Sequence, residues 1–220
     1  MNNNISSQDW PVTKRKIVDA GVNLMRSRGF NATTLDDICA AAGVTKGGFF
    51  HYFKSKEEIA KAALERFAAG KSNDFQNAEF RKVTDSLERL FARLDFVVQS
   101  IGGTSRVTKG CLIGMLAQEL SASNPALRAA CQASFVRVAQ DFENDLIAAK
   151  ADYAPKASFD TKSVATLYVA IIQGSLMLAK SSESNRVLAE NIEHFRRYLQ
   201  FLFGKRNPNP KHSSAIAARN

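Results

Sequence analysis

The chain contains few of the residues from which metal sites and disulfide frameworks are built. Its 220 residues include three cysteines and three histidines. Cys39, Cys111 and Cys131 form no CxxC pair, and the histidines have no metal-ligand spacing. An odd number of scattered cysteines argues against a disulfide scaffold and against a structural zinc site. We therefore expect no metal, no other cofactor and a reducing compartment.

Long hydrophobic runs are also missing. The most apolar stretch, residues 164–179, is shorter than a bilayer requires and contains Thr, Gln and Ser, so it predicts a buried helix. The opening MNNNISSQDW lacks the charged start and the apolar core of a signal peptide. These features predict a soluble protein of the cytoplasm.

Catalytic motifs are absent as well. The sequence has no P-loop, GxGxxG, GxSxG or HExxH pattern. The carboxylates of Asp141, Glu143 and Asp145 are spaced as on the solvated face of a helix. A Cys111–His194 dyad would rest on residue types alone. We do not expect an enzyme, and a cysteine-dependent enzyme is kept only as an unfavoured alternative.

Basic charge is abundant, but only at the two ends. Residues 1–56 carry eight Lys or Arg and four Asp or Glu, and residues 204–220 carry four and none. Residues 57–203 carry eighteen and seventeen, so this long middle segment is nearly neutral. The net charge of +9 is therefore local, which favours a polyanion-binding module over a uniformly basic protein.

Helical periodicity runs through almost the whole chain, and no segment alternates as a strand does. The predicted fold is all-α. Breaks rich in Gly, Pro, Ser and Asn separate the helices. The expected helices cover residues 13–28, 34–42, 45–51, 56 to about 71, 83–101, 111–121, 125–151, 161–182 and 186–203.

Capping residues mark the starts of the short helices. Thr34 with Asp37 and Ser55 with Glu58 have the spacing of a capping box. Thr45 can cap the helix between them. These caps place the starts of three helices, two short and one long, at the end of the first quarter of the chain.

The second and third expected helices, joined by an Ala-Gly-Val turn around Gly43, form a predicted helix-turn-helix unit. Such a unit inserts its second helix into the major groove of DNA. Gly47 and Gly48 cost about 1 kcal/mol each in helix propensity. They leave the first turn without bulk, so its backbone can approach a phosphate or a base edge closely. Phe49 and Phe53, four residues apart, are expected to anchor the unit on the first helix.

The run T-x-x-x-I-C-x-A-A-G-V-T-K-G-G-F-F-H-Y-F-x-S-K-E-E, within residues 13–60, resembles the DNA-binding domain of tetracycline-repressor (TetR) family regulators. The resemblance implies a homodimeric repressor with a three-helix DNA-binding domain and a helical domain that holds a small-molecule pocket. It also implies a protein that associates with the nucleoid.

Position by position, the resemblance implies DNA contacts for Thr34, Thr45, Lys46, Gly47, Gly48, Phe50, His51, Tyr52 and Lys56. Lys54 is expected beside Lys56, over the phosphates. The family usually has Tyr where this chain has Phe50, so one hydroxyl contact to phosphate is missing. His51 or Tyr52 could compensate for it.

The last two helices carry more apolar surface than one protomer covers, which predicts a two-fold dimer through them. Ala170, Gly174 and Ser175 would permit close approach of the two backbones. A two-fold dimer requires double-stranded DNA with an inverted repeat. The expected division is a flexible arm over 1–11, the helix-turn-helix domain over 12–56, the ligand-binding and dimerisation domain over 57–203, and a disordered basic tail over 204–220.

The ligand pocket is predicted to be lined by Phe67, Phe91, Cys111, Met115, Phe135, Tyr168 and Gln173. This lining implies a mainly apolar effector with a polar handle. Cys111 follows Gly110 at an expected helix start with cations just upstream, where a thiolate is favoured.

Cys111 is therefore either a sensor for electrophiles or oxidants, or a small buried residue that begins an apolar helix. A ligand-independent architectural DNA-binding protein is a further alternative. The length of the region after residue 56 argues against it, because DNA binding alone needs far less chain.

Overall fold

The computed structural model describes residues 10–101 and 109–204, and every regular element in them is a helix. The expected tail after Gly204, most of the expected arm and the Gly102-Gly103 break lie outside these residues. The elements are α1 (Val12–Arg28), α2 (Leu35–Ala42), α3 (Lys46–Phe50), α4 (Lys56–Gln76), the 3₁₀ helix η1 (Glu79–Lys82), α5 (Ser86–Ser100), α6 (Leu112–Leu120), α7 (Pro125–Tyr153), α8 (Thr161–Ser181) and α9 (Arg186–Leu202).

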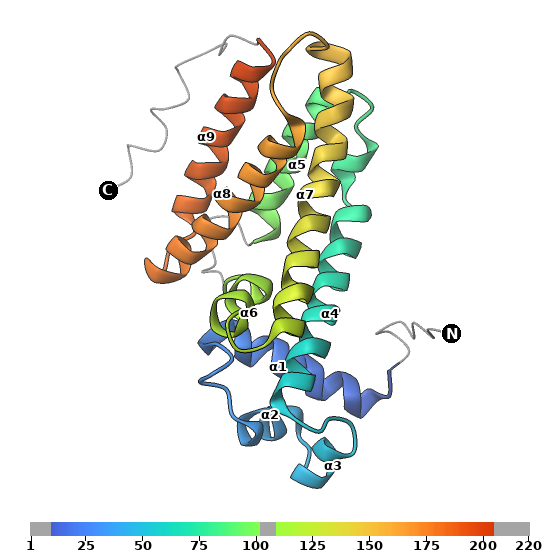
Figure 1. Ribbon diagram of the computed structural model, residues 1–220, viewed down its shortest axis with the longest axis vertical. Helices are drawn as coiled ribbons and strands as arrows, with labels where there is room; N and C mark the ends of the chain where they lie inside the picture. Colours follow the sequence, from blue (N-terminus) through green and yellow to red (C-terminus); the bar gives the residue numbers. More distant parts are fainter. Residues whose placement is uncertain (1–9, 102–108, 205–220) are drawn as a thin grey trace.

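The helices form a bundle with a smaller group of helices at one end (Figure 1). The long helices α4, α5, α7, α8 and α9 make up the bundle, and α1, α2 and α3 make up the end. The short helix α6 lies at the junction, where it packs on α1, α4 and α7. The all-α prediction is confirmed, and α6 joins the two parts.

The predicted helices are all present, and the difference at α5 has a local cause. This helix was expected from residue 83 but begins at Ser86, because the Asp85 carboxylate accepts hydrogen bonds from the N–H groups of Leu87 and Glu88 at 3.0 and 2.8 Å. A side chain that caps an N-terminus in this way fixes where the helix starts. Val83, the first residue expected in this helix, is instead the C-cap residue of η1.

The two predicted capping boxes differ. Thr34 and Asp37 form a complete box, since the Thr34 hydroxyl accepts from the Asp37 N–H at 3.1 Å and the Asp37 carboxylate accepts from the Thr34 N–H at 2.9 Å. Ser55 accepts from the Glu58 N–H at 3.3 Å, but the Glu58 carboxylate accepts from the N–H of Lys54 at 2.8 Å. The box predicted at Ser55 is therefore only half formed.

Two groups of buried side chains make up the core, and they do not divide at residue 56. The first group joins α1 to α4 with α6 and the start of α7, and includes Ile17, Ile38, Phe49, Leu64, Leu116 and Cys131. The second joins α5, the rest of α7, α8 and α9, and includes Leu94, Phe142, Tyr168, Ile192 and Phe195. The helix-turn-helix unit therefore has no separate core that ends at residue 56.

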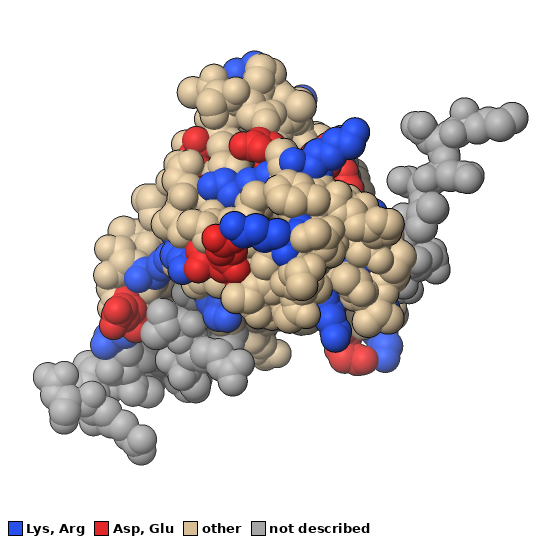
Figure 2. All heavy atoms as spheres, turned by 90° about the horizontal axis from the view of Figure 1, so that it is seen from below, with Lys and Arg blue, Asp and Glu red and all other residues tan. Residues whose placement is uncertain are grey.

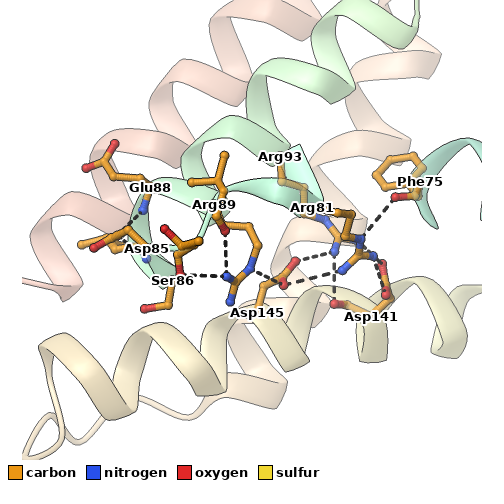
Figure 3. A network of polar contacts seen from close by, with 12 residues as sticks. Phe75, Arg81, Asp85, Ser86, Glu88, Arg89, Arg93, Asp141 and Asp145 are labelled. Atoms are coloured by element: carbon orange, nitrogen blue, oxygen red, sulfur yellow. Dashed lines mark hydrogen bonds and ion pairs between the residues drawn. The ribbon is translucent and has the colours of Figure 1, made fainter. Parts of the chain in front are cut away.

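A buried ion-pair network holds α5 and η1 on α7 (Figure 3). Arg93 of α5 is 1% exposed and lies 2.8 Å from the carboxylates of both Asp141 and Asp145. Arg81 of η1 pairs with Asp141 at 2.6 Å, and Arg89 approaches Asp145 at 3.5 Å. Buried charges are stable only when they are matched in this way.

The network overturns the prediction of a solvated carboxylate face. Asp145 is 5% exposed, because it faces arginines from segments more than fifty residues away along the chain. Burial acts to raise the pKa of Asp141, but the charges of Arg93 and Arg81 outweigh it and hold that pKa below its ordinary value. Pairing between distant helices leaves no periodic signal in the sequence of α7.

The length argument against a membrane span is also wrong for α8. The helix has 21 residues and is long and apolar enough to cross a membrane by length and composition. It packs on α7 and α9 in the fold, yet only 33% of its most apolar window is buried. The prediction that the apolar run is a buried helix is therefore correct for one side of α8 only.

The bare side of α8 continues onto α9. We name these exposed large hydrophobic residues the α8–α9 face: Leu167, Met177, Leu178, Tyr198 and Phe201. Phe201 is 80% exposed. Ser175 does not belong to this face, contrary to expectation, because it is buried and accepts a hydrogen bond from Asn191 at 3.0 Å.

Candidate DNA-binding face and ligand cavity

The turn that joins α2 to α3 is set by a glycine and a threonine. Gly43 ends α2 in the left-handed conformation, at φ 65°, which glycine adopts without strain. Thr45 then caps α3, because its hydroxyl accepts from the Gly48 N–H at 3.1 Å. Phe49 and Phe53 are buried, as predicted, in the core that α1 shares. These contacts fix α3 and leave its opposite side exposed.

Nothing in the fold itself requires glycine at the start of α3. A Cβ atom at Gly47 would meet only the Thr45 hydroxyl, at 3.8 Å. One at Gly48 would lie 3.5 Å from the same hydroxyl and 3.7 Å from the Val44 Cβ, which are ordinary contacts. Two glycines that weaken the helix without relieving a clash leave space for something outside the protein.

The predicted lysines have different partners. Lys46 is exposed and pairs with Asp36 at 2.9 Å, and the hydrogen bond and charge of Asp36 raise the pKa of Lys46. Lys54 is exposed. The Lys56 ammonium is turned toward the loop after α1, where it donates to the Phe30 carbonyl at 3.1 Å and lies 4.2 Å from the centre of the Phe30 ring. Lys46 and Lys54 are thus exposed, and Lys56 is half-buried with a partner inside the protein.

The remaining predicted contact residues surround α3. Phe50 is 52% exposed, and Thr34 and His51 are exposed too. Tyr52 is half-buried, with its ring edge-to-face with His51 at 4.7 Å between centroids. Figure 2 looks onto this end of the molecule and shows Lys and Arg side chains spread over it, with Asp and Glu among them.

The second candidate site is a cavity of about 490 Å³ where α1, α4, α5, α6, α7 and α8 meet, which we call the junction cavity. The structure brings five of the seven predicted pocket residues into its wall: Phe67, Cys111, Phe135, Tyr168 and Gln173. Met115 lines an adjacent hollow of about 430 Å³. Phe91 lies outside the wall, under the guanidinium of Arg196.

Residues of α1 also line the junction cavity, and the sequence reasoning missed them. They are Asn23 and Arg26. Arg26 lies in the last turn of α1, where a basic side chain is expected merely to complement the helix dipole. Only the packing of α6 against α1 reveals its second role. A larger hollow, of about 770 Å³ beside η1 and α5, has no wall residue from α1, α2 or α3.

Arg26 joins three helices at the edge of the junction cavity. Its Nε donates to the Gly110 carbonyl, just before α6, at 3.1 Å. The Lys180 ammonium of α8 donates to the Arg26 carbonyl at 3.2 Å. The guanidinium also lies 5.0 Å from the centre of the Phe67 ring of α4. A change at this cavity wall therefore reaches α1 directly.

A second connection runs from α6 to the loop after α1. The Glu119 carboxylate accepts from the N–H groups of Phe30 and Asn31 at 3.0 and 2.7 Å. Gly29 precedes them with φ 93°, a conformation that side chains other than glycine rarely adopt. A Cβ atom at Gly29 would lie 2.5 Å from Glu119 Oε1. Glycine is required here both for its backbone angle and for this carboxylate.

The three cysteines have different surroundings. Cys39 and Cys131 are buried, and burial raises the pKa of both thiols. Cys111 is the half-buried N-cap residue of α6 and lines both the junction cavity and the adjacent hollow. His194 is exposed on α9 and belongs to neither wall, so this geometry gives a Cys111–His194 dyad no support. Among the described residues, no group of three or more His, Cys, Asp or Glu is placed to hold a metal ion.

Two family models match this chain. The model described as "Bacterial regulatory proteins, tetR family" matches residues 17–63. The model described as "Transcriptional regulator LmrA/YxaF-like, C-terminal domain" matches residues 86–194. The two matches cover the helix-turn-helix end and most of the helical bundle.

Known proteins of similar length resemble this chain in sequence, at low identity. An uncharacterised HTH-type transcriptional regulator in the lacX 3' region of Lactococcus lactis subsp. lactis is 27% identical over 181 residues, which cover 82% of this chain and 90% of that protein. The HTH-type transcriptional repressor DhaR of Mycobacterium sp. (strain GP1) is 24% identical over 173 residues, covering 79% and 84%.

Solved structures share the fold over most of the chain. Regulatory protein TetR from Rhodobacter sphaeroides superposes with a TM-score of 0.77 at 23% identity, over 86% of this chain and 99% of the other. Escherichia coli NemR in its reduced form gives 0.70 at 26% identity, over 84% and 96%. A cysteine mutant of CifR complexed with 26-bp operator DNA gives 0.69 at 21% identity, over 82% and 94%.

Proposed function

Because the chain belongs to the TetR family of bacterial transcriptional regulators, we propose that it is a dimeric repressor that is released from an inverted-repeat operator when a small effector enters the junction cavity. One observation carries this proposal: the cavity wall includes Asn23 and Arg26 of α1 together with residues of the bundle. A ligand in this place contacts the helix that supports the DNA-binding unit.

The DNA-binding part of the proposal rests on the exposed side of α3. Gly47 and Gly48 leave room for a close backbone approach, and Phe50 projects from the same short helix. Lys46 would exchange its carboxylate partner Asp36 for a phosphate. The CifR structure, which shares this fold, is described as an operator complex, and this description supports an operator as the partner here.

The proposal of a dimer is based on the α8–α9 face. Bare large hydrophobic side chains on two adjacent helices are typical of a surface that a partner covers. Pairing this face with its own copy about a two-fold axis gives a four-helix bundle and presents two α3 helices to successive major grooves. Light scattering that gives the mass of a single chain at micromolar concentration would contradict this part.

Release requires that the effector bind the DNA-free arrangement better than the DNA-bound one. A ligand wedged between Arg26 of α1, Phe67 of α4 and the bundle would displace α1 and α4. Displacing these helices in both protomers changes the separation of the two α3 helices. The effector then changes the spacing between the two DNA-binding units without altering either unit.

The test begins by footprinting the purified protein on the promoter of its own gene. Metabolites are then screened for release of that DNA. The expected result is a protected inverted repeat whose occupancy falls with a cavity-filling compound, and a weaker complex for Lys46→Ala. Protection that no compound relieves would favour the ligand-independent architectural alternative.

A thiol-based release mechanism is the second candidate, because Cys111 lines the junction cavity beside Arg26. The thiol is half-buried, and an electrophile that enters the cavity can reach it. Two related structures are described by redox state or cysteine mutation, NemR as reduced and CifR as a cysteine mutant. Release by electrophiles in the wild type but not in Cys111→Ser would establish this mechanism, and equal release in both would exclude it.

A further inference from the structure

The charged residues of the junction cavity wall are all of one sign. They are Arg26, Lys71 and Lys109, and no Asp or Glu belongs to the wall that the described residues form. The other residues of the wall are mostly apolar, including four aromatic residues. An apolar site bounded only by cations attracts a ligand that carries a negative group.

Arg26 is the cation best placed to hold such a group. Within the described residues it has no carboxylate partner, while Lys71 is already paired with Asp74 at 3.1 Å and Lys109 is exposed. Burial acts to lower the pKa of the Arg26 guanidinium. Its Nε is used by a neutral carbonyl, that of Gly110, and its other nitrogens have no partner among the described residues. A guanidinium presents a fork that matches two carboxylate oxygens.

Tyr168 contributes to the wall, but its hydroxyl belongs to the surroundings of Arg93. The side chain is fully buried and stacks on Phe142 at 3.9 Å between centroids. Burial raises the pKa of the Tyr168 hydroxyl, and the charge and hydrogen bonding of Arg93 act against this shift. The ligand's negative group is therefore assigned to Arg26 and not to Tyr168.

We propose that the junction cavity binds an amphipathic carboxylate, with its acid group on Arg26 and its apolar body against Phe67, Phe135 and Ile172. This inference names the ligand class for the regulator proposed above, and only its consequence for DNA rests on that proposed function. The terminal nitrogens of the guanidinium donate charge-assisted hydrogen bonds to the acid, while Nε keeps the Gly110 carbonyl. The acid group therefore lies beside the contact between α1 and the start of α6.

Three compounds with one skeleton test the charge preference: 4-phenylbutyrate, 4-phenylbutan-1-ol and 4-phenylbutylamine. Calorimetry on the purified protein without DNA should give an acid affinity at least about tenfold above that of the alcohol, with the amine weakest. Added salt should weaken binding of the acid but not of the alcohol. Equal affinities, a preference for the amine, or no binding of the acid at millimolar concentration would overturn the proposal.

Variants locate the group that reads the charge. Arg26→Gln keeps an N–H donor for the Gly110 carbonyl and should bind acid and alcohol equally. Arg128→Met, which removes an exposed cation from α7, is the matched control and should keep the preference for the acid. Persistence of that preference in Arg26→Gln would overturn the role of Arg26. The salt dependence in the wild type decides the charge preference if this variant does not fold.

Operator release is measured separately, by fluorescence anisotropy of labelled DNA. Acid binding that depends on Arg26 without release supports the carboxylate site and contradicts the release mechanism of the proposed function. Equal binding of acid and alcohol with release by both supports that mechanism and overturns the carboxylate site. The two proposals can therefore fail independently.

Discussion

Arg93 in the bundle is buried and Arg26 at its junction with the DNA-binding end is half-buried, yet the protein matches the charge of only one of them. Arg93 lies 2.8 Å from each of two carboxylates. Arg26 has a carbonyl and an aromatic ring for neighbours. A matched buried charge holds helices together, whereas an unmatched one is a place where a partner completes the contacts.

The DNA-binding end extends the same contrast. Phe50 is largely exposed, and a Cβ atom at Gly47 or Gly48 would make only ordinary contacts with Thr45 and Val44. The bundle network of Figure 3, in contrast, is filled by its own carboxylates and arginines. Groups that the chain satisfies internally are expected to govern stability, and groups that it leaves unsatisfied are expected to govern binding.

The largest expected effect is on the free energy of unfolding, and it should differ between variants of the two arginines. Arg93→Ala leaves Asp145 buried without its nearest partner, so it should lower the free energy of unfolding by about 3–5 kcal/mol. Arg26→Gln should lower it by no more than about 1 kcal/mol. Urea unfolding of the two variants and the wild type measures both values. Equal losses would remove the distinction between a structural and a binding arginine.

The next effect is a loss of operator binding that is not caused by a loss of stability. Gly47→Ala adds one methyl group to the exposed start of α3 and should weaken operator binding by about tenfold. It should raise stability by up to about 1 kcal/mol, because alanine favours the helix. Gly70→Ala is the matched control, since Gly70 is also an exposed helical glycine, and apart from its chain neighbours and the backbone of its own helix no described atom lies within 4 Å of its Cβ position.

Anisotropy titrations with operator DNA check this pair of glycine variants. Gly70→Ala should share the gain in stability and keep the wild-type affinity. If Gly47→Ala binds the operator as tightly as the wild type, the space beside α3 is not used by DNA.

A smaller effect on operator affinity is expected at Lys46, whose only charged partner among the described residues is the exposed Asp36. Asp36→Asn removes the carboxylate that competes with phosphate for this lysine, so operator affinity should rise. Exposed ion pairs contribute about 1 kcal/mol or less, which limits the gain to about fivefold. The gain should disappear in the Asp36→Asn, Lys46→Ala double variant. An unchanged affinity of the single variant would place Lys46 away from the phosphates.

The smallest effect is a pH dependence at the start of α2. Hydrogen bonds from Thr34, and then from Arg28, lower the pKa of Asp37 from 3.8 to about 2. Since the folded state favours the ionised form, this contribution to stability is complete above the unfolded pKa and is lost as pH falls through the folded one. Thermal unfolding of wild type and Asp37→Asn should therefore differ most near neutral pH and converge near pH 2. A constant difference would contradict the assignment.

The sequence was sufficient where the contacts are local. The Thr34–Asp37 box, the Thr45 cap and the burial of Phe49 depend on residues three or four positions apart, which a periodic pattern records. These features were enough to identify the helix-turn-helix unit and its family. The order and approximate length of the later helices followed from the same periodicity.

The predictions that failed depend on distant partners. Arg93 meets Asp145 across 52 positions, and Arg26 meets the Gly110 carbonyl across 84. Lys56 donates to a carbonyl 26 positions away, a partner that the motif did not indicate, and its phosphate contact stays a prediction. No pattern along the chain records such pairs, so the place of Arg26 in the cavity wall and the buried network appear only in the folded structure.

The contact between Gly29 and Glu119 constrains how this regulator can be recombined. A chimera that joins residues 12–56 to the ligand domain of another regulator would keep the glycine and lose the carboxylate that binds the N–H groups of Phe30 and Asn31. Such a hybrid is expected to keep the proposed operator binding and to lose the proposed response to an effector. A graft that also transplants α6 carries both halves of the contact, so the unit that can be exchanged is discontinuous in sequence.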